Sequence, residues 1–369
     1  MTVTRADLPS LTGMRWAAAF MVFGLHIVVA SMLDPDSAGS KVASLLFGAG
    51  EIGVSFFFVL SGFVLMWSAR PGDSPLRFWR RRLARIYPVH IVTALLAVVL
   101  GATLGQLARP DVFYGVPDFD VFLTNVFLIH SWIPGEQQSL NTVSWTLACE
   151  AFFYLTFPIW GALARRLSAR GAWVFALVSV GLVVLPAYVQ GELPAVHWLQ
   201  AFPAARIGEF TLGVALARLV ALEAWRGPRL EIAVGVMLLS YFLVPVWPGQ
   251  YAFSVATIIG FGVLIPAAAV ADLRNEQSFW RSPTMVRLGE LSFAFYMVHL
   301  LVIRVVRRAA PGLVRLHSTP ELFVVAGIFV VSLGLAWALY EYVETPCRRF
   351  LTRPRQAVSN RPTALDVRA

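Results

Sequence analysis

Long apolar segments alternate along the chain with short polar segments that are rich in arginine. A helix needs about 20 predominantly apolar residues to cross the hydrocarbon core of a bilayer, which is about 30 Å thick. This criterion predicts ten membrane-spanning helices, at residues 14–33, 52–69, 86–107, 142–163, 172–190, 198–218, 231–247, 251–271, 288–307 and 321–341. The pattern therefore predicts an all-α, polytopic membrane protein.

The composition agrees with this interpretation. The chain has 369 residues, of which 58% are hydrophobic, and its mean hydropathy is +0.69. Such values are far too apolar for an ordinary soluble domain. The formal net charge of +9 could indicate a nucleic-acid partner, but the basic residues lie between apolar segments and do not cover one face. We therefore expect a lipid bilayer, and no nucleic acid, as a partner.

The placement of arginine predicts the orientation, because connections rich in Lys and Arg stay on the cytoplasmic side. Five such segments join alternate ends of the predicted spans, at residues 77–85, 164–170, 218–229, 272–287 and 347–355. These ends, and with them both termini, are predicted to be cytoplasmic. One basic cluster lies at an end that this scheme places outside, namely Arg304, Arg307, Arg308 and Arg315. The scheme is kept because five basic connections outnumber one.

The chain is predicted to form one membrane domain over residues 1–350, followed by a short cytoplasmic tail over 351–369. The tail ends in SNRPTALDVRA, which cannot bury apolar surface and is expected to be disordered. The segment VFLTNVFLIHSWI, at 121–133, is apolar but too short to cross a bilayer. We expect it to be interfacial or re-entrant.

Two polar residues bracket an apolar stretch of the first predicted span, RWAAAFMVFGLH, from Arg15 to His26. Eleven helical steps of about 100° bring His26 back to within roughly 20° of Arg15 and place it about 16 Å deeper. Ionisable groups inside spans are costly and usually face a cavity or a partner. We therefore expect both side chains to line one cavity, with Arg15 at the cytoplasmic mouth and His26 near the midplane.

Other predicted spans carry polar residues at similar depth, namely Ser61, Glu150, Arg206, Glu209, Ser292, Tyr296 and His299. Together they predict a polar chamber inside the bundle. Several have a structural alternative. Arg206 and Glu209 can form an i,i+3 ion pair that fastens helices, and His299 can make an interhelical hydrogen bond. Ser61 is either a small packing residue beside Gly62 or a nucleophile.

The run FWRRRLARIYP places Arg82 and Arg85 three residues apart, on one face of the helix that leads into the span at 86–107. At the cytoplasmic interface these arginines could set the topology and bind anionic lipid. They could also capture phosphate, which suits the planar guanidinium group. Position alone leaves both alternatives open.

Five motifs occur in a fixed order along the chain: Arg15 with His26, SGF at 61–63, R-x-x-R at Arg82 and Arg85, SWTLACEAFFY around Glu150, and LSFAFYMVH ending at His299. In this order they resemble the acyltransferase-3 family of integral membrane acyltransferases. The resemblance extends over almost the whole chain. Members of that family have about ten spans and transfer acyl groups, commonly acetyl from acetyl-CoA, to hydroxyls of sugars, polysaccharides or antibiotic macrolides.

The resemblance implies an O-acyltransferase of the bacterial inner membrane that uses acyl-CoA as the donor and needs no metal. It implies catalytic roles for Arg15, His26 and Glu150 and CoA binding by Arg82 and Arg85. Acyl transfer to an alcohol requires a base that removes the hydroxyl proton. We predict that His26 is this base and that Glu150 orients it or balances its charge.

A transporter is the alternative hypothesis, in which charges near the midplane bind a small polar solute or an exported glycan. Many transporters are built from inverted repeats with discontinuous helices. No such repeat is recognisable in the sequence, so the acyltransferase is the favoured hypothesis.

Overall fold

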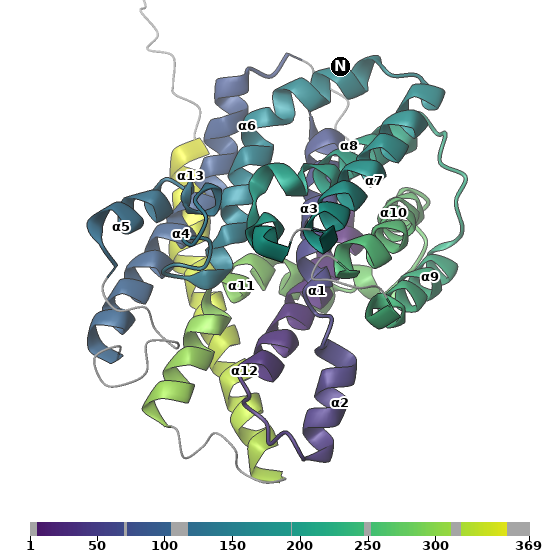
Figure 1. Cartoon of the computed structure of the whole chain (residues 1–369). Helices are drawn as coiled ribbons and strands as arrows, with labels where there is room; N and C mark the ends of the chain where they lie inside the picture. The colour runs from purple at the N-terminus through teal and green to yellow at the C-terminus, as the bar shows by residue number, and fades with distance from the viewer. Residues whose placement is uncertain are drawn as a thin grey trace, which may run out of the picture.

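The computed structural model describes residues 6–69, 72–104, 117–192, 194–246, 252–310 and 319–352. Over these ranges the chain forms helices and turns and contains no strand (Figure 1). The α-helices are α1 (Pro9–Val29), α2 (Ala38–Phe47), α3 (Ile52–Ser68), α4 (Pro75–Leu104), α5 (Phe119–Val126), α6 (Trp145–Arg166), α7 (Ala169–Glu192), α8 (Ile207–Ala221), α9 (Leu230–Phe242), α10 (Ala252–Leu273), α11 (Pro283–Ala309), α12 (Thr319–Leu339) and α13 (Thr345–Thr352). A π-helical turn, Tyr340–Glu344, joins α12 to α13. The predicted all-α, polytopic fold is confirmed.

Eight segments of the described chain are long and apolar enough to cross a bilayer, namely Pro9–Val29, Ala38–Ser68, Pro75–Leu104, Thr142–Arg166, Ala169–Gln190, Phe253–Leu273, Pro283–Ala309 and Glu321–Thr352. Two other helices that coincide with predicted spans are shorter: α8 has 15 residues and α9 has 13. All ten predicted segments are therefore wholly or partly helical where the structure describes them. The number of crossings stays a prediction.

The predicted span at 198–218 is not one continuous α-helix. Two 3₁₀ helices, Pro194–Ala201 and Pro203–Arg206, precede α8. Pro203 begins the second of these 3₁₀ helices, and it has no backbone N–H to donate to the turn before it, which favours a break at this position. The break places Arg206 at the N-cap of α8, with its side chain almost completely buried. A buried cation at such a break needs partners inside the protein.

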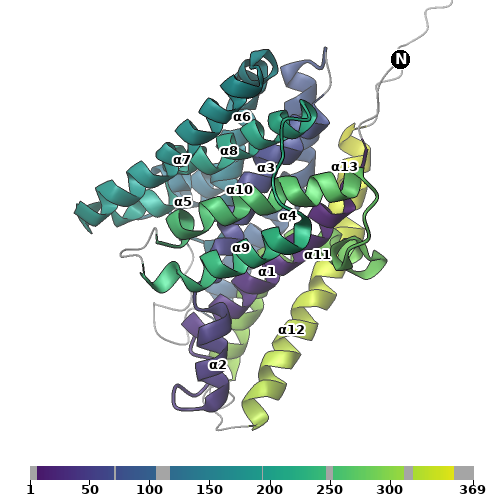
Figure 2. The same ribbon diagram turned by 90° about the vertical axis from the view of Figure 1, so that its right-hand side faces the viewer.

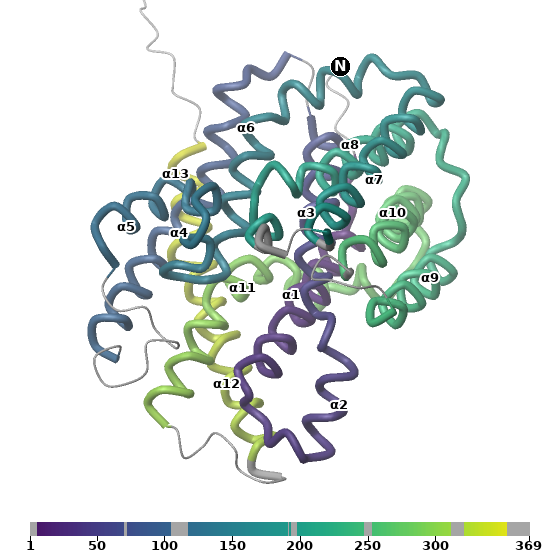
Figure 3. Tube along the Cα trace, in the orientation of Figure 1, coloured from purple at the N-terminus to yellow at the C-terminus, as the bar shows by residue number. Residues whose placement is uncertain are grey.

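The two ends of the described chain lie toward the same end of the bundle. Figures 1 and 2 show the start of α1 and the end of α13 toward the top of both views, and the indole of Trp67 donates to the Ala6 carbonyl at 3.2 Å. The tube in Figure 3 shows α2 and the start of α12 at the opposite end. The placement of both termini on the cytoplasmic side stays a prediction. Most of the predicted tail, residues 353–369, lies outside the described residues.

The apolar segment at 121–133 forms only short helices. Helix α5 has eight residues and is followed by the 3₁₀ helix His130–Trp132. The segment is fixed against α4, where the Tyr87 hydroxyl donates to the Val126 carbonyl at 2.8 Å. A helix of this length cannot cross a bilayer, so the expected interfacial or re-entrant position stays the interpretation.

Helices α3 and α8 approach each other closely at two glycines. A β-carbon at Gly62 would lie 1.9 Å from the Phe210 carbonyl oxygen, and one at Gly213 would lie 1.9 Å from the Val59 carbonyl oxygen. Both distances are far below a van der Waals contact, so a side chain at either position has to push the helices apart. Because α3 also carries Ser61, this contact helps to position the cavity described below.

Gly62→Ala should therefore destabilise the protein. Overpacking an interior contact typically costs about 1–3 kcal/mol, and here the obstacle is backbone, which cannot rotate away. The midpoint of thermal unfolding in detergent should fall. Gly235→Ala is the matched control, because nothing lies within 4 Å of a β-carbon at that helical position. Equal melting of the two variants would contradict the close contact of α3 with α8.

Candidate active site

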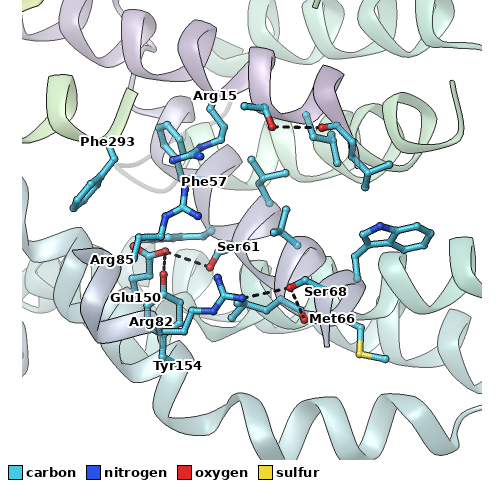
Figure 4. A pocket seen from close by; sticks show the side chains of 18 of the residues that line it. Arg15, Phe57, Ser61, Met66, Ser68, Arg82, Arg85, Glu150, Tyr154 and Phe293 are labelled. Atoms are coloured by element: carbon cyan, nitrogen blue, oxygen red, sulfur yellow. Dashed lines mark hydrogen bonds between the residues drawn. The ribbon is translucent and has the colours of Figure 1, made fainter. Parts of the chain in front are cut away.

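A cavity of about 1550 Å³ is lined by residues of α1, α3, α4, α6, α8 and α11 and of the segment that precedes α1. Four of the five predicted site residues line it, namely Arg15, Arg82, Arg85 and Glu150. Figure 4 shows that their side chains reach into the same space from three helices, α1, α4 and α6. The tertiary structure thus brings these four residues together, while their catalytic and binding roles stay predictions.

Glu150 accepts hydrogen bonds from two side chains. The hydroxyl of Tyr154, one turn later on α6, donates to Oε1 at 2.5 Å, and the Ser61 hydroxyl on α3 donates to the same oxygen at 3.4 Å (Figure 4). Both bonds fix the orientation of the carboxylate. Sequence analysis did not select Tyr154, although its i,i+4 spacing from Glu150 is a signal that places both on one helix face.

Positive charge predominates in the cavity. Its lining includes five arginines, Arg15, Arg82, Arg85, Arg165 and Arg218, and two acidic residues, Asp7 and Glu150. None of the ion pairs found between described residues involves Arg15, Arg82 or Arg85. Clefts lined by one sign of charge attract ligands of the opposite sign. The cavity therefore suits an anionic ligand.

Arg82 is held in place but keeps hydrogen-bonding capacity. Its guanidinium carbon lies 5.6 Å from the centroid of the Phe78 ring, and Nη2 donates to Ser68 Oγ at 3.4 Å. Its Nε is buried and has no hydrogen-bond acceptor among the described residues. Arg218 differs, because its Nε and Nη2 both donate to the Leu167 carbonyl, at 3.1 and 2.9 Å. A buried N–H without an acceptor is costly, and an anion bound beside Arg82 would supply one.

His26 lies outside the lining of this cavity. Its Nδ1 lies 2.7 Å from Nε2 of His299 on α11. Tyr296 connects the two regions, because it lines the cavity and its ring centroid lies 5.9 Å from that of His299. The expectation that Arg15 and His26 line one cavity is therefore not met. Helical spacing shows which residues share a face of one helix, but not which residues of other helices pack against that face.

Residues 8–341 of the chain match the model of a protein family that is described as an acyltransferase domain. The match includes all five predicted site residues and all the helices that line the cavity. The chain belongs to the acyltransferase-3 family.

Curated relatives support the same assignment. Acyltransferase MdmB of Streptomyces mycarofaciens is 36% identical, over 97% of this chain and 96% of that protein. Nodulation protein 10 of Rhizobium leguminosarum bv. viciae is 26% identical, over 87% of this chain and 89% of that protein. O-acetyltransferase OatA of Staphylococcus aureus is 25% identical, over 93% of this chain but 57% of that protein. No solved structure is significantly similar to the chain.

The protein is accordingly an acyltransferase that transfers groups other than aminoacyl groups, and the family and its relatives support O-acyl transfer. Its eight apolar helical segments, counted over the described residues, agree with a multi-pass membrane enzyme. None of the three relatives is named as a transporter. The comparisons therefore favour the enzyme over the transporter alternative.

The Arg206–Glu209 pair lies outside the cavity of the acyltransferase. Arg206 Nε lies 2.8 Å from Glu209 Oε2, and both side chains are 1% exposed. The guanidinium also contacts the hydroxyls of Ser254 on α10 and Ser55 on α3, at 3.1 and 3.2 Å. The pair joins α8 to two other helices, which favours the fastening role over direct chemistry.

The remaining predicted chamber residues divide into two groups. Ser61 and Tyr296 line the cavity, whereas the Ser292 hydroxyl donates to the Gly289 carbonyl at 2.8 Å within α11. Among the residues that the structure describes, no three His, Cys, Asp or Glu side chains are grouped as a metal site. The cavity lining itself offers guanidinium, carboxylate and hydroxyl groups.

Proposed function

We propose that this acyltransferase moves an acyl group, in the simplest case acetyl, from acyl-CoA to a hydroxyl of a sugar, a polysaccharide or a macrolide-like metabolite. The observation that carries the proposal is the cavity in which Arg15, Arg82 and Arg85 surround Glu150 and form no close ion pair with any described residue. CoA carries several phosphate groups, and guanidinium groups bind phosphate through strong, charge-assisted hydrogen bonds. The buried Nε of Arg82 adds a donor that needs an acceptor.

We assign the base of the reaction to His26. The acceptor hydroxyl oxygen attacks the thioester carbonyl carbon, a C–O bond forms and the C–S bond breaks. His26 takes the hydroxyl proton and then gives it to the departing CoA thiolate, so the products are the ester and the CoA thiol. His26 is bonded to His299, and the ring of His299 lies 5.9 Å from that of Tyr296, which lines the cavity. The acyl end of the donor therefore has to reach the part of the cavity where Tyr296 lies.

Glu150 is assigned a role beside the arginines of the cavity. Its hydrogen bonds join it to Tyr154 and Ser61, and no hydrogen bond between described residues joins it to His26. We propose that its carboxylate partly offsets the charge of Arg15 and Arg85. This would keep the guanidinium groups in place before the phosphates of CoA arrive.

We also propose that the arginine-lined end of the bundle faces the cytoplasm of a bacterial inner membrane. CoA thioesters are available on that side, and the arginine-rich connections are expected to stay there. In this orientation the donor enters the cavity directly from the compartment in which it is made.

The proposed function is tested with purified protein and acetyl-CoA. Release of free CoA that depends on an added hydroxylated acceptor supports the enzyme, whereas solute flux without thiol release would support a transporter. Mass spectrometry of glycans and small metabolites from cells with and without the gene should identify the acceptor. A product that loses the mass of one acyl group would identify the acyl group as well.

Arg85→Ala should raise the KM for acyl-CoA by about 10- to 100-fold and change kcat much less. One charged hydrogen bond contributes about 1.5–3 kcal/mol, and loss of uniform binding appears in KM. Added salt should weaken donor binding by the wild type more than by the variant.

Arg80→Ala is the matched control for Arg85→Ala. It removes the same charge from the same helix, α4, but Arg80 is exposed and does not line the cavity. If both variants bind acyl-CoA like the wild type and insert in mixed orientations, the arginines set topology only, and the assignment of Arg85 to CoA binding is wrong.

A further inference from the structure

His26 and His299 form a hydrogen-bonded pair whose proton positions follow from their contacts. His26 Nδ1 lies 2.7 Å from His299 Nε2, and the two rings are stacked with centroids 5.0 Å apart. The other ring nitrogen of His299, Nδ1, lies 3.1 Å from the Phe295 carbonyl oxygen. The two residues are 273 positions apart in sequence, so only the packing of α1 on α11 creates the pair.

The carbonyl of Phe295 determines the tautomer of His299. A carbonyl oxygen only accepts hydrogen bonds, so Nδ1 of His299 has to carry a proton. His299 is fully buried and its ring lies against Phe23, Phe295 and Tyr296, surroundings in which a charged imidazolium is costly. The neutral ring has one N–H, so its Nε2 carries a lone pair.

The tautomer of His299 determines that of His26 in turn. Because His299 Nε2 can only accept, His26 Nδ1 has to donate to it, and the lone pair of a neutral His26 then lies on Nε2. The only hydrogen bond that the His26 ring makes among the described residues is the one through Nδ1 to His299, so Nε2 is left available. We infer that His299 is a positioning residue that holds His26 in the tautomer with a basic Nε2, an inference that rests on the proposed role of His26.

This arrangement has a defined effect on acyl transfer. When the acceptor hydroxyl attacks the thioester, its proton moves to His26 Nε2, and the same proton then passes to the departing thiolate. Between these steps His26 is an imidazolium, and its Nδ1–H makes a charge-assisted bond to His299 Nε2. His299 thereby orients the base, as the third residue of a catalytic triad does, although His299 is neutral.

The test compares His299→Phe with His299→Gln. Phenylalanine keeps an aromatic ring but removes the acceptor, whereas the glutamine amide oxygen can accept from His26 Nδ1 at about the position of Nε2. His299→Phe should slow single-turnover transfer from acetyl-CoA by at least about 10-fold, up to the roughly 10²- to 10⁴-fold contribution of a general base. Acetyl-CoA affinity should not change, and His299→Gln should restore most of the rate.

Two further measurements separate positioning from a general structural role. In a His26→Ala background, His299→Phe should cause no additional loss of rate, because His299 acts only through His26. Nitrogen-15 NMR of histidine-labelled protein should show His26 protonated on Nδ1 in the wild type and a mixture of tautomers in His299→Phe. This second result does not depend on activity.

Several outcomes would overturn the inference. If His299→Phe transfers at the wild-type rate while His26→Ala is slow, His299 does not position the base, and the proposed function still stands. NMR that finds His26 protonated on Nε2 in the wild type would also show that His299 does not position the base. So would a loss of transfer rate from His299→Phe that is equally large in the wild type and in the His26→Ala background. If His26→Ala itself transfers at the wild-type rate, the assignment of the base fails and this inference fails with it.

Discussion

His26→Ala should slow acyl transfer by about 10²- to 10⁴-fold, which is the usual contribution of a general base, while acyl-CoA still binds normally. The imidazole acts on the proton of the acceptor and lies outside the arginine-lined cavity, so its loss should not disturb the phosphate contacts. The measurements are single-turnover transfer, acyl-CoA affinity and the thermal unfolding midpoint, all on the same preparations.

Arg15→Ala is the informative comparison for His26→Ala, because both residues lie on α1 and only Arg15 lines the cavity. It should lose activity through weaker acyl-CoA binding. If each variant loses stability and activity in parallel, both residues only hold α1 in the bundle. A folded His26→Ala protein that binds acyl-CoA and transfers at the wild-type rate would remove histidine from the mechanism.

Glu209→Ala should destabilise the protein by about 3–5 kcal/mol, the usual result of removing one partner of a buried ion pair. The variant leaves the Arg206 guanidinium, which is 1% exposed, without its carboxylate between α8, α3 and α10. A lower thermal unfolding midpoint in detergent would measure the effect. Activity should fall only as far as the folded fraction falls, since the pair lies outside the cavity.

Glu231→Ala is the matched control for Glu209→Ala. Glu231 pairs with Arg229 at 3.9 Å, and their side chains are 74% and 75% exposed, so the change should cost at most about 1 kcal/mol. If Glu209→Ala melts like the wild type but transfers no acyl group, the pair takes part in the chemistry and the fastening role is wrong.

The sequence was sufficient for the fold class, the family and most of the cavity. Apolar segments of bilayer length predict membrane helices because a bilayer leaves no water to satisfy exposed backbone groups. Arg82 and Arg85 lie on one helix face because they are three residues apart, and both line the cavity. The ordered motifs predicted the family, which the match over residues 8–341 confirms.

Only the tertiary structure decided which of the predicted residues reach the cavity and which side chains each of them contacts. Helical periodicity placed Arg15 and His26 on one stripe of α1, but only Arg15 lines the cavity, and the partner of His26 is 273 residues away. The spacing of residues along one helix fixes only the direction in which each side chain points. What that side chain meets depends on the side chains that other helices bring to the same place, and this is set by packing.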